Sequence, residues 1–160
     1  MSSPIADAGT FDSNSDEAAA AVLHAVLNAP GSWCNLEFQP IDDGAAGAGD
    51  SFFGFIAARG PMNPLATVMA STAGKKPKPA EIGIQHHAGV KAAAQLTEAG
   101  LSLPAGARVV QDHPRRGLVV RCEEGIDAAG VVAWLIPAMR ILSRQPATTV
   151  VNYVVTAGGS

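Results

Sequence analysis

The sequence predicts an α+β fold, in which a mostly antiparallel sheet of about five to six strands is covered by three amphipathic helices. The order of the expected elements carries this prediction: one helix, three strands, a second helix, two strands, a third helix and a last strand. Apolar residues recur at helical spacing in the helical segments, and they alternate or run together in the strand segments. Aromatic residues make up only 5% of the chain, so aliphatic side chains must build most of the core.

The first helix is expected to follow Ser15. The Ser15 hydroxyl can cap the next turn, and Asp16 and Glu17 suit the positive end of the helix dipole. Apolar residues then recur at helical spacing as far as Leu27, and a Pro-Gly pair ends the helix. Residues 1–14 are small, polar and acidic, and we expect a disordered N-terminal tail. Residues 15–160 then form a single domain, a normal size for one core.

Three strands are expected next, at residues 33–39, 51–59 and 65–71. In the first, Cys34, Leu36 and Phe38 alternate with polar or amphipathic residues, which predicts a sheet packed on one side. Residues 42–50 form a Gly/Ala-rich connection with three aspartates. Residues 74–79 form a basic loop broken by prolines.

The second half of the chain contains the remaining elements. Residues 81–86 predict a short strand or the irregular start of a helix, and the Ala-rich helix 88–99 ends at Gly100. Strands 107–111 and 118–122 flank a loop from Asp112 to Gly117. Asp127 caps a helix that reaches about residue 144, where Pro137 removes one hydrogen bond and predicts a kink. A β-branched strand over residues 148–156 comes last.

The charges are distributed unequally along the chain. Residues 1–58 contain eight acidic side chains and no lysine or arginine, whereas residues 59–160 contain all eleven basic side chains and six acidic ones. The net charge of −3 thus conceals two regions of opposite sign. We expect the acidic front to dock on the back of the chain, on a second copy or on a cationic partner.

Composition and motifs argue against several classes of function. No apolar run is long enough to span a membrane, and the N-terminus lacks a signal sequence, so we expect a cytoplasmic protein. The two cysteines, Cys34 and Cys122, suit neither a metal knuckle nor a disulfide framework, and we expect both to be buried. No nucleotide-binding glycine motif occurs, and no aromatic platform accompanies the lysines. We therefore expect no cofactor, no metal site, no nucleic-acid partner and no membrane partner.

The loop from Asp112 to Gly117 is the densest group of chemically capable side chains. Arg115 and Arg116 can present planar forks to a phosphate or carboxylate, and His113 could serve as an acid or base. His86, at the junction of a strand and a helix, could join an anion site there. The alternative is a solvated hairpin turn in which Asp112 accepts hydrogen bonds from turn amides.

These observations predict a non-catalytic module that acts through protein–protein contacts, expected as a homodimer. Helix 126–144 or the Ala-faced helix 88–99 would supply the interface. The alternative function is a small-anion-binding protein or enzyme that uses the loop Asp112 to Gly117 with His113, Arg115, Arg116 and His86. No motif decides whether the chain is an enzyme.

Overall fold

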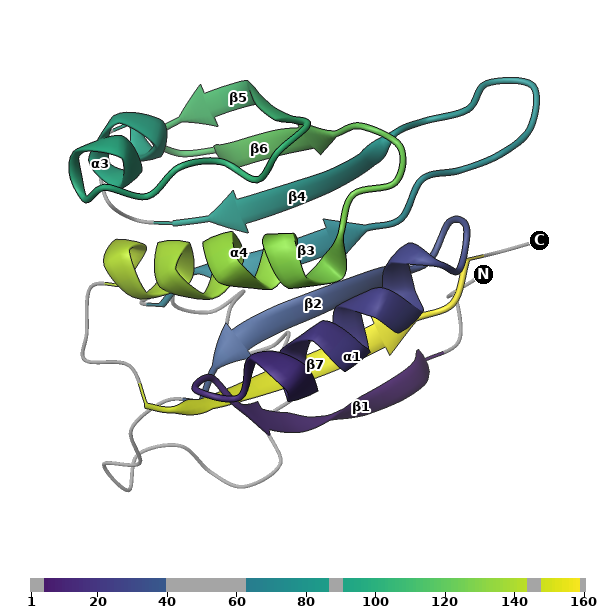
Figure 1. Cartoon of the computed structure of the whole chain (residues 1–160), viewed down its shortest axis with the longest axis horizontal. Coiled ribbons are helices and arrows are strands. Elements are labelled where there is room, and N and C mark those ends of the chain that lie inside the picture. The colour runs from purple at the N-terminus through teal and green to yellow at the C-terminus, as the bar shows by residue number, and fades with distance from the viewer. Residues whose placement is uncertain (1–4, 40–62, 87–90, 144–147, 159–160) are drawn as a thin grey trace.

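A computed structural model describes residues 5–39, 63–86, 91–143 and 148–158 of the chain. This part forms a seven-stranded antiparallel sheet with strand order β1-β7-β2-β3-β4-β6-β5, together with three helices. Figure 1 shows α1 and α4 side by side over the same face of the sheet. The predicted α+β class is therefore confirmed, and the predicted number of strands was too low.

The elements follow the order of the chain, and their bounds are these: β1 (Ile5–Asp12), α1 (Asp16–Leu27), β2 (Trp33–Phe38), β3 (Leu65–Met69), β4 (Ala80–Gln85), α3 (Ala92–Glu98), β5 (Ala107–His113), β6 (Gly117–Cys122), α4 (Ala128–Leu142) and β7 (Val150–Thr156). The strand predicted at residues 51–59 lies outside the described residues. The predicted hairpin loop is shorter than expected, because Asp112 and His113 belong to β5 and Gly117 begins β6.

The core lies between the sheet and the helices. On β2, Cys34, Leu36 and Phe38 are fully buried, which confirms the apolar face that the sequence predicts. Asn35 and Glu37 point to the other face, where solvent exposure was expected, yet they are only 8% and 6% exposed. The prediction for this second face was therefore wrong, since Asn35 and Glu37 are buried on it as well as the apolar residues on the first face.

Local sequence signals place the helix ends correctly. The Ser15 hydroxyl accepts a hydrogen bond from the Ala18 amide at 3.3 Å, and the Asp127 carboxylate accepts one from the Ala129 amide at 3.4 Å. Gly100 follows α3 with φ = 83°, a left-handed conformation that glycine adopts without strain.

Strand β1 corrects the prediction of a disordered tail over residues 1–14. Residues 5–12 pair with β7 in an antiparallel ladder, and the Phe11 ring stacks on Tyr153 with 6.1 Å between centroids. Seven of the eight β1 residues are exposed, and the sequence IADAGTFD lacks the regular alternation of large apolar residues that predicts a strand. Its order comes from backbone hydrogen bonds to the last strand of the chain, which local composition does not reveal.

Helix α4 is a core element and not a free surface. Nine of its fifteen residues are buried, including Trp134 and Met139, and α4 packs against α1 and the sheet. Helix α3 buries Ala92 and Leu96. These contacts leave little of α4 free for the predicted dimer interface, and the use of α3 as an interface stays a prediction. Helix α4 continues through Pro137, and the kink there stays a prediction.

The two edges of the sheet are β1 and β5. Ile5 on β1 and Val109 and Val110 on β5 are among the large apolar side chains that remain exposed. None of the helices in the described part is long and apolar enough to cross a membrane. Of the five exposed large apolar side chains in the described residues, three therefore lie on the two edge strands and none lies on a helix.

Candidate protein-binding site

The predicted anion site at the β5–β6 hairpin uses its polar groups within the chain. The Asp112 carboxylate accepts hydrogen bonds from the Ala92 and Ala93 amides at 2.9 and 3.1 Å. These are the first amides of α3, where an external anion would otherwise be stabilised. The carboxylate of Asp112 therefore occupies the position that a bound anion would take at α3.

His113 has a structural role in the same hairpin. Its Nδ1 atom accepts hydrogen bonds from the Arg115 and Arg116 amides at 3.1 and 3.2 Å, so the imidazole closes the turn. A ring nitrogen that accepts these bonds carries no proton. The side chains of Arg115 and Arg116 are exposed at the tip.

His86 lies at the same end of the sheet as this turn, because Leu118 pairs with both Ile84 and Asp112. However, His86 is only 3% exposed, whereas the two arginines face solvent. The structure thus brings His113, Arg115 and Arg116 together and leaves His86 buried beside the hairpin.

The described part of the acidic front contacts the back of the chain through backbone pairing and apolar packing. Strand β1 pairs with β7, and α1 packs against α4. The ion pair seen among the described residues joins Arg121 to Glu81, both in the back region, at 2.9 Å. The carboxylates of β1 and α1 consequently make no ion pair within the described part of the chain.

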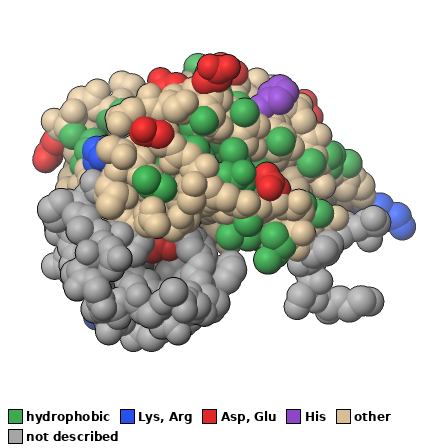
Figure 2. Space-filling view, turned by 90° about the horizontal axis from the view of Figure 1, so that it is seen from below, with side chains coloured by type: hydrophobic (Ala, Val, Ile, Leu, Met, Phe, Trp, Pro, Cys, Tyr) green, Lys and Arg blue, Asp and Glu red, His purple; other side chains and the backbone are tan. Residues whose placement is uncertain are grey.

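A groove lies between α1 and the edge of the sheet formed by β1 and β7. We call it the α1–β1 groove; it has a volume of about 430 Å³. Small apolar side chains dominate its lining, which consists of Ala6, Asp7, Ala21, Val22, Ala25, Ala29, Ser32, Val155 and Ala157. Figure 2 shows the molecule from this side: hydrophobic side chains gather over the middle of the face, acidic ones lie among them, and basic ones lie toward the margins.

The sequence explains why this groove stays open. Ala21 and Ala25 are four residues apart, so they lie along one side of α1, and Ala29 follows just beyond the end of the helix. On the strand side, Ala6 and Ala157 line the groove with side chains of the same size. Methyl-sized side chains on both walls leave the space between helix and strand unfilled.

Asp7 is the charged group of the groove. One of its oxygens accepts a hydrogen bond from the Ala8 amide at 2.9 Å, and the other accepts one from the Tyr153 hydroxyl at 3.2 Å. Burial raises the pKa of Tyr153, and the hydrogen bond from its hydroxyl to the Asp7 carboxylate raises it further. These bonds hold the carboxylate of Asp7 in one orientation at the groove.

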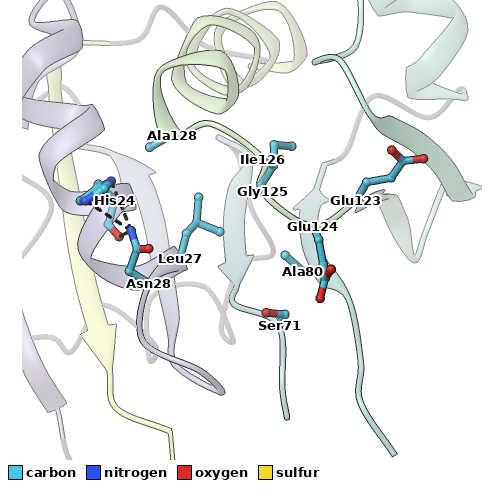
Figure 3. A pocket seen from close by; sticks show the side chains of 10 residues that line it. All are labelled: His24, Leu27, Asn28, Ser71, Ala80, Glu123, Glu124, Gly125, Ile126 and Ala128. Carbon is cyan, nitrogen blue, oxygen red and sulfur yellow. Dashed lines mark hydrogen bonds between the residues drawn. The ribbon is translucent and has the colours of Figure 1, made fainter.

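A second, smaller pocket of about 140 Å³ lies between the end of α1 and the β6–α4 connection. Figure 3 shows that Glu123 and Glu124 point in different directions, while the His24 ring and the Asn28 amide lie within hydrogen-bond distance of each other at 3.2 Å. Among the described residues, no group of His, Cys, Asp and Glu side chains is arranged to hold a metal ion. This pocket therefore lacks a convergent set of ligands.

Glu37 is a titratable group whose burial no local sequence pattern reveals. It lies between Asn152 on β7 and Leu65 on β3, in the middle of the sheet. Burial raises the pKa of Glu37 from 4.5 to about 7. On the same face, the Thr67 hydroxyl donates a hydrogen bond to the Asn35 side-chain oxygen at 2.8 Å.

The groove was also missed, because β1 was expected to be disordered. The available signal was the repeat of alanines along α1 opposite a segment of small residues.

Comparisons with protein-family models, with curated proteins and with solved structures find no match to this chain.

Proposed function

We propose that the chain is a non-catalytic protein-association module that binds a partner protein in the α1–β1 groove. The observation that carries this proposal is an open groove with apolar walls on the acidic side of the molecule. Exposed apolar patches with polar surroundings are typical of protein interfaces.

The chemistry of the groove defines its partner. The alanines and Val22 favour apolar side chains, whereas Asp7 and the acidic first turn of α1 favour lysine or arginine. A partner segment that combines both kinds of residue gains from apolar burial and from opposite charge, and opposite charge also accelerates association. The partner is therefore a cationic, partly apolar segment.

The candidate reactive groups support the non-catalytic part of the proposal, because each of them has a structural role or is unreactive. His113 closes a turn, and Asp112 caps α3. Burial raises the pKa of Cys34 to about 12 and that of Cys122 to about 11, so both thiols stay protonated and unreactive.

The charge of the groove limits how two copies of the chain could form a homodimer through it. Two copies that met symmetrically here would place acidic groups against each other, which opposes binding. The second copy must instead supply a basic surface, such as the exposed loop that contains Lys75, Lys76 and Lys78. The contact closes as a dimer when each copy places this loop in the groove of the other, and sedimentation should then show a dimer that dissociates as salt increases. A monomer at micromolar concentration in low and moderate salt would contradict the homodimer and leave another protein as the partner.

Binding of a labelled peptide of alternating leucine and lysine tests the groove directly. Ala25→Arg places a bulky cation in the groove, and His24→Arg places the same cation on the neighbouring position of α1, outside the groove lining. We expect fluorescence anisotropy to show binding by the wild type and by His24→Arg, and loss of binding by Ala25→Arg. Equal binding by both variants, or equal binding of a leucine–glutamate peptide, would refute the proposal.

A small anion at the β5–β6 turn is the second candidate function. The observation that favours it is the exposure of Arg115 and Arg116 on adjacent positions of one turn. A thermal-shift screen of phosphorylated and carboxylated metabolites should then give a shift that the Arg115→Ala, Arg116→Ala double variant loses. No shift with any of these anions would end this alternative.

A further inference from the structure

A row of charges crosses three neighbouring strands at the β5 end of the sheet. Glu81 on β4 lies directly opposite Arg121 on β6, and Arg121 lies directly opposite Arg108 on β5. Residues that are directly opposite in a ladder share one face, and here it is the face turned away from Ile82 and the helical layer. The row therefore brings two cations and one carboxylate into line.

The charges in this row do not balance, because two cations share one carboxylate. Glu81 accepts two hydrogen bonds from Arg121, from Nε at 3.0 Å and from Nη2 at 2.9 Å. Arg108 is exposed and makes no ion pair within the described part of the chain. Like charges that face each other across a ladder are destabilising, so Arg108 beside Arg121 favours a carboxylate on its other side.

The other side of Arg108 is the free edge of the sheet. Strand β5 is terminal in the strand order, so within the part of the chain that the structure describes the backbone groups on its outer side have no neighbouring strand. A β-bulge between Val109 and Gln111 takes Val110 out of the regular ladder, and Val109 and Val110 are 37% and 40% exposed. The edge thus combines free backbone groups, two apolar side chains and one uncompensated cation.

We propose that β5 binds an acidic, extended segment of a partner protein as an additional strand. Backbone hydrogen bonds attach the segment, as in other cases of strand addition. An aspartate or glutamate of the segment lies opposite Arg108 and completes a row of two cations between two carboxylates. This surface goes beyond the α1–β1 groove: it lies at the opposite end of the sheet and selects the opposite charge.

The partner is a different chain and not strand β1 of a second copy. Strand β1 is acidic and lies at the other edge, so β1 of one copy against β5 of the next would leave the same two edges free at each end. Such head-to-tail contacts form open filaments unless a ring closes. A separate acidic segment pairs with β5 once, so no filament grows from this contact.

A charge exchange at Arg108 tests the proposal with defined probes. One probe is a labelled peptide of alternating valine and glutamate, and the other is its valine–lysine counterpart. We expect the wild type to bind the glutamate peptide and Arg108→Glu to bind it roughly tenfold more weakly, while gaining affinity for the lysine peptide. Lys91→Glu is the matched control, since it makes the same change of charge at an exposed position just before α3.

Hydrogen exchange identifies where the peptide binds. Strand addition should slow the exchange of β5 amides in the presence of the glutamate peptide, and Ala25→Arg in the α1–β1 groove should not alter this protection. Binding that is unchanged in Arg108→Glu, or that protects no β5 amide, would overturn the proposal. Protection of β5 without peptide, together with self-association, would also overturn it, because the occupant would then be a second copy.

Discussion

The buried carboxyl of Glu37 should make the stability of this protein depend on pH in a defined window. The substitution Glu37→Gln replaces the carboxyl by a neutral group of nearly the same shape. Glu37 is 6% exposed, and burial raises its pKa from 4.5 to about 7. The folded protein therefore holds the proton more tightly than the unfolded chain does.

The sign and size of the effect follow from this difference. Below about pH 4.5 the carboxyl is protonated in both states and has no effect on folding. Between that pH and about 7 the unfolded chain ionises first, so the wild type loses stability as pH rises, and above about 7 the loss is complete. Since a change of one in pKa corresponds to about 1.4 kcal/mol, the full loss is roughly 3 kcal/mol.

Urea denaturation followed by circular dichroism at about pH 5 and about pH 8.5 measures this effect. Glu37→Gln should unfold within about 1 kcal/mol of the wild type at the lower pH and be more stable by roughly 3 kcal/mol at the higher one. Glu98→Gln on α3 removes one exposed carboxylate and controls for the change in net charge. A difference between Glu37→Gln and the wild type that is the same at both pH values would refute the assignment of a buried, protonated carboxyl.

Two further predictions concern the β5–β6 hairpin. Gly117→Ala should destabilise the fold by about 2 kcal/mol or more in thermal unfolding, because φ is +87° and the added Cβ would collide with the Ile84 carbonyl oxygen; Gly83→Ala, where a Cβ meets nothing within 4 Å, should cost much less, and equal losses would contradict the collision. Asp112→Ala should cost about 1 kcal/mol and accelerate hydrogen exchange at the first two amides of α3, whereas unchanged exchange there would contradict its role as a cap.

The sequence was sufficient for features that depend on neighbouring residues. The cap at Ser15, the end of α3 at Gly100 and the apolar face of β2 each follow from a few adjacent side chains. Because these signals are local, they do not depend on how distant parts of the chain fold. The α+β class follows from their order along the chain.

Strand β1 and the groove beside it could not be predicted in the same way. The order of β1 comes from its ladder with β7 and from contacts such as Tyr153 with Asp7, which join the two ends of the sequence. The roles at the predicted anion site are also non-local. The Asp112 carboxylate accepts hydrogen bonds from amides that lie 20 and 19 residues earlier in the chain. The sequence identified the polar residues of that hairpin, but not the groups that they satisfy.

The position of β7 explains how the charge asymmetry of the sequence becomes a property of the surface. Strand β7 lies between β1 and β2, so the last strand joins the acidic front to the sheet by backbone hydrogen bonds. Backbone hydrogen bonds do not neutralise side-chain carboxylates. The carboxylates of β1 and α1 therefore remain available to a cationic partner at one end of the sheet. At the other end, Arg108, Arg115 and Arg116 are exposed on the β5–β6 hairpin. Opposite charges therefore face outward at opposite edges, and each edge favours a partner that the other repels.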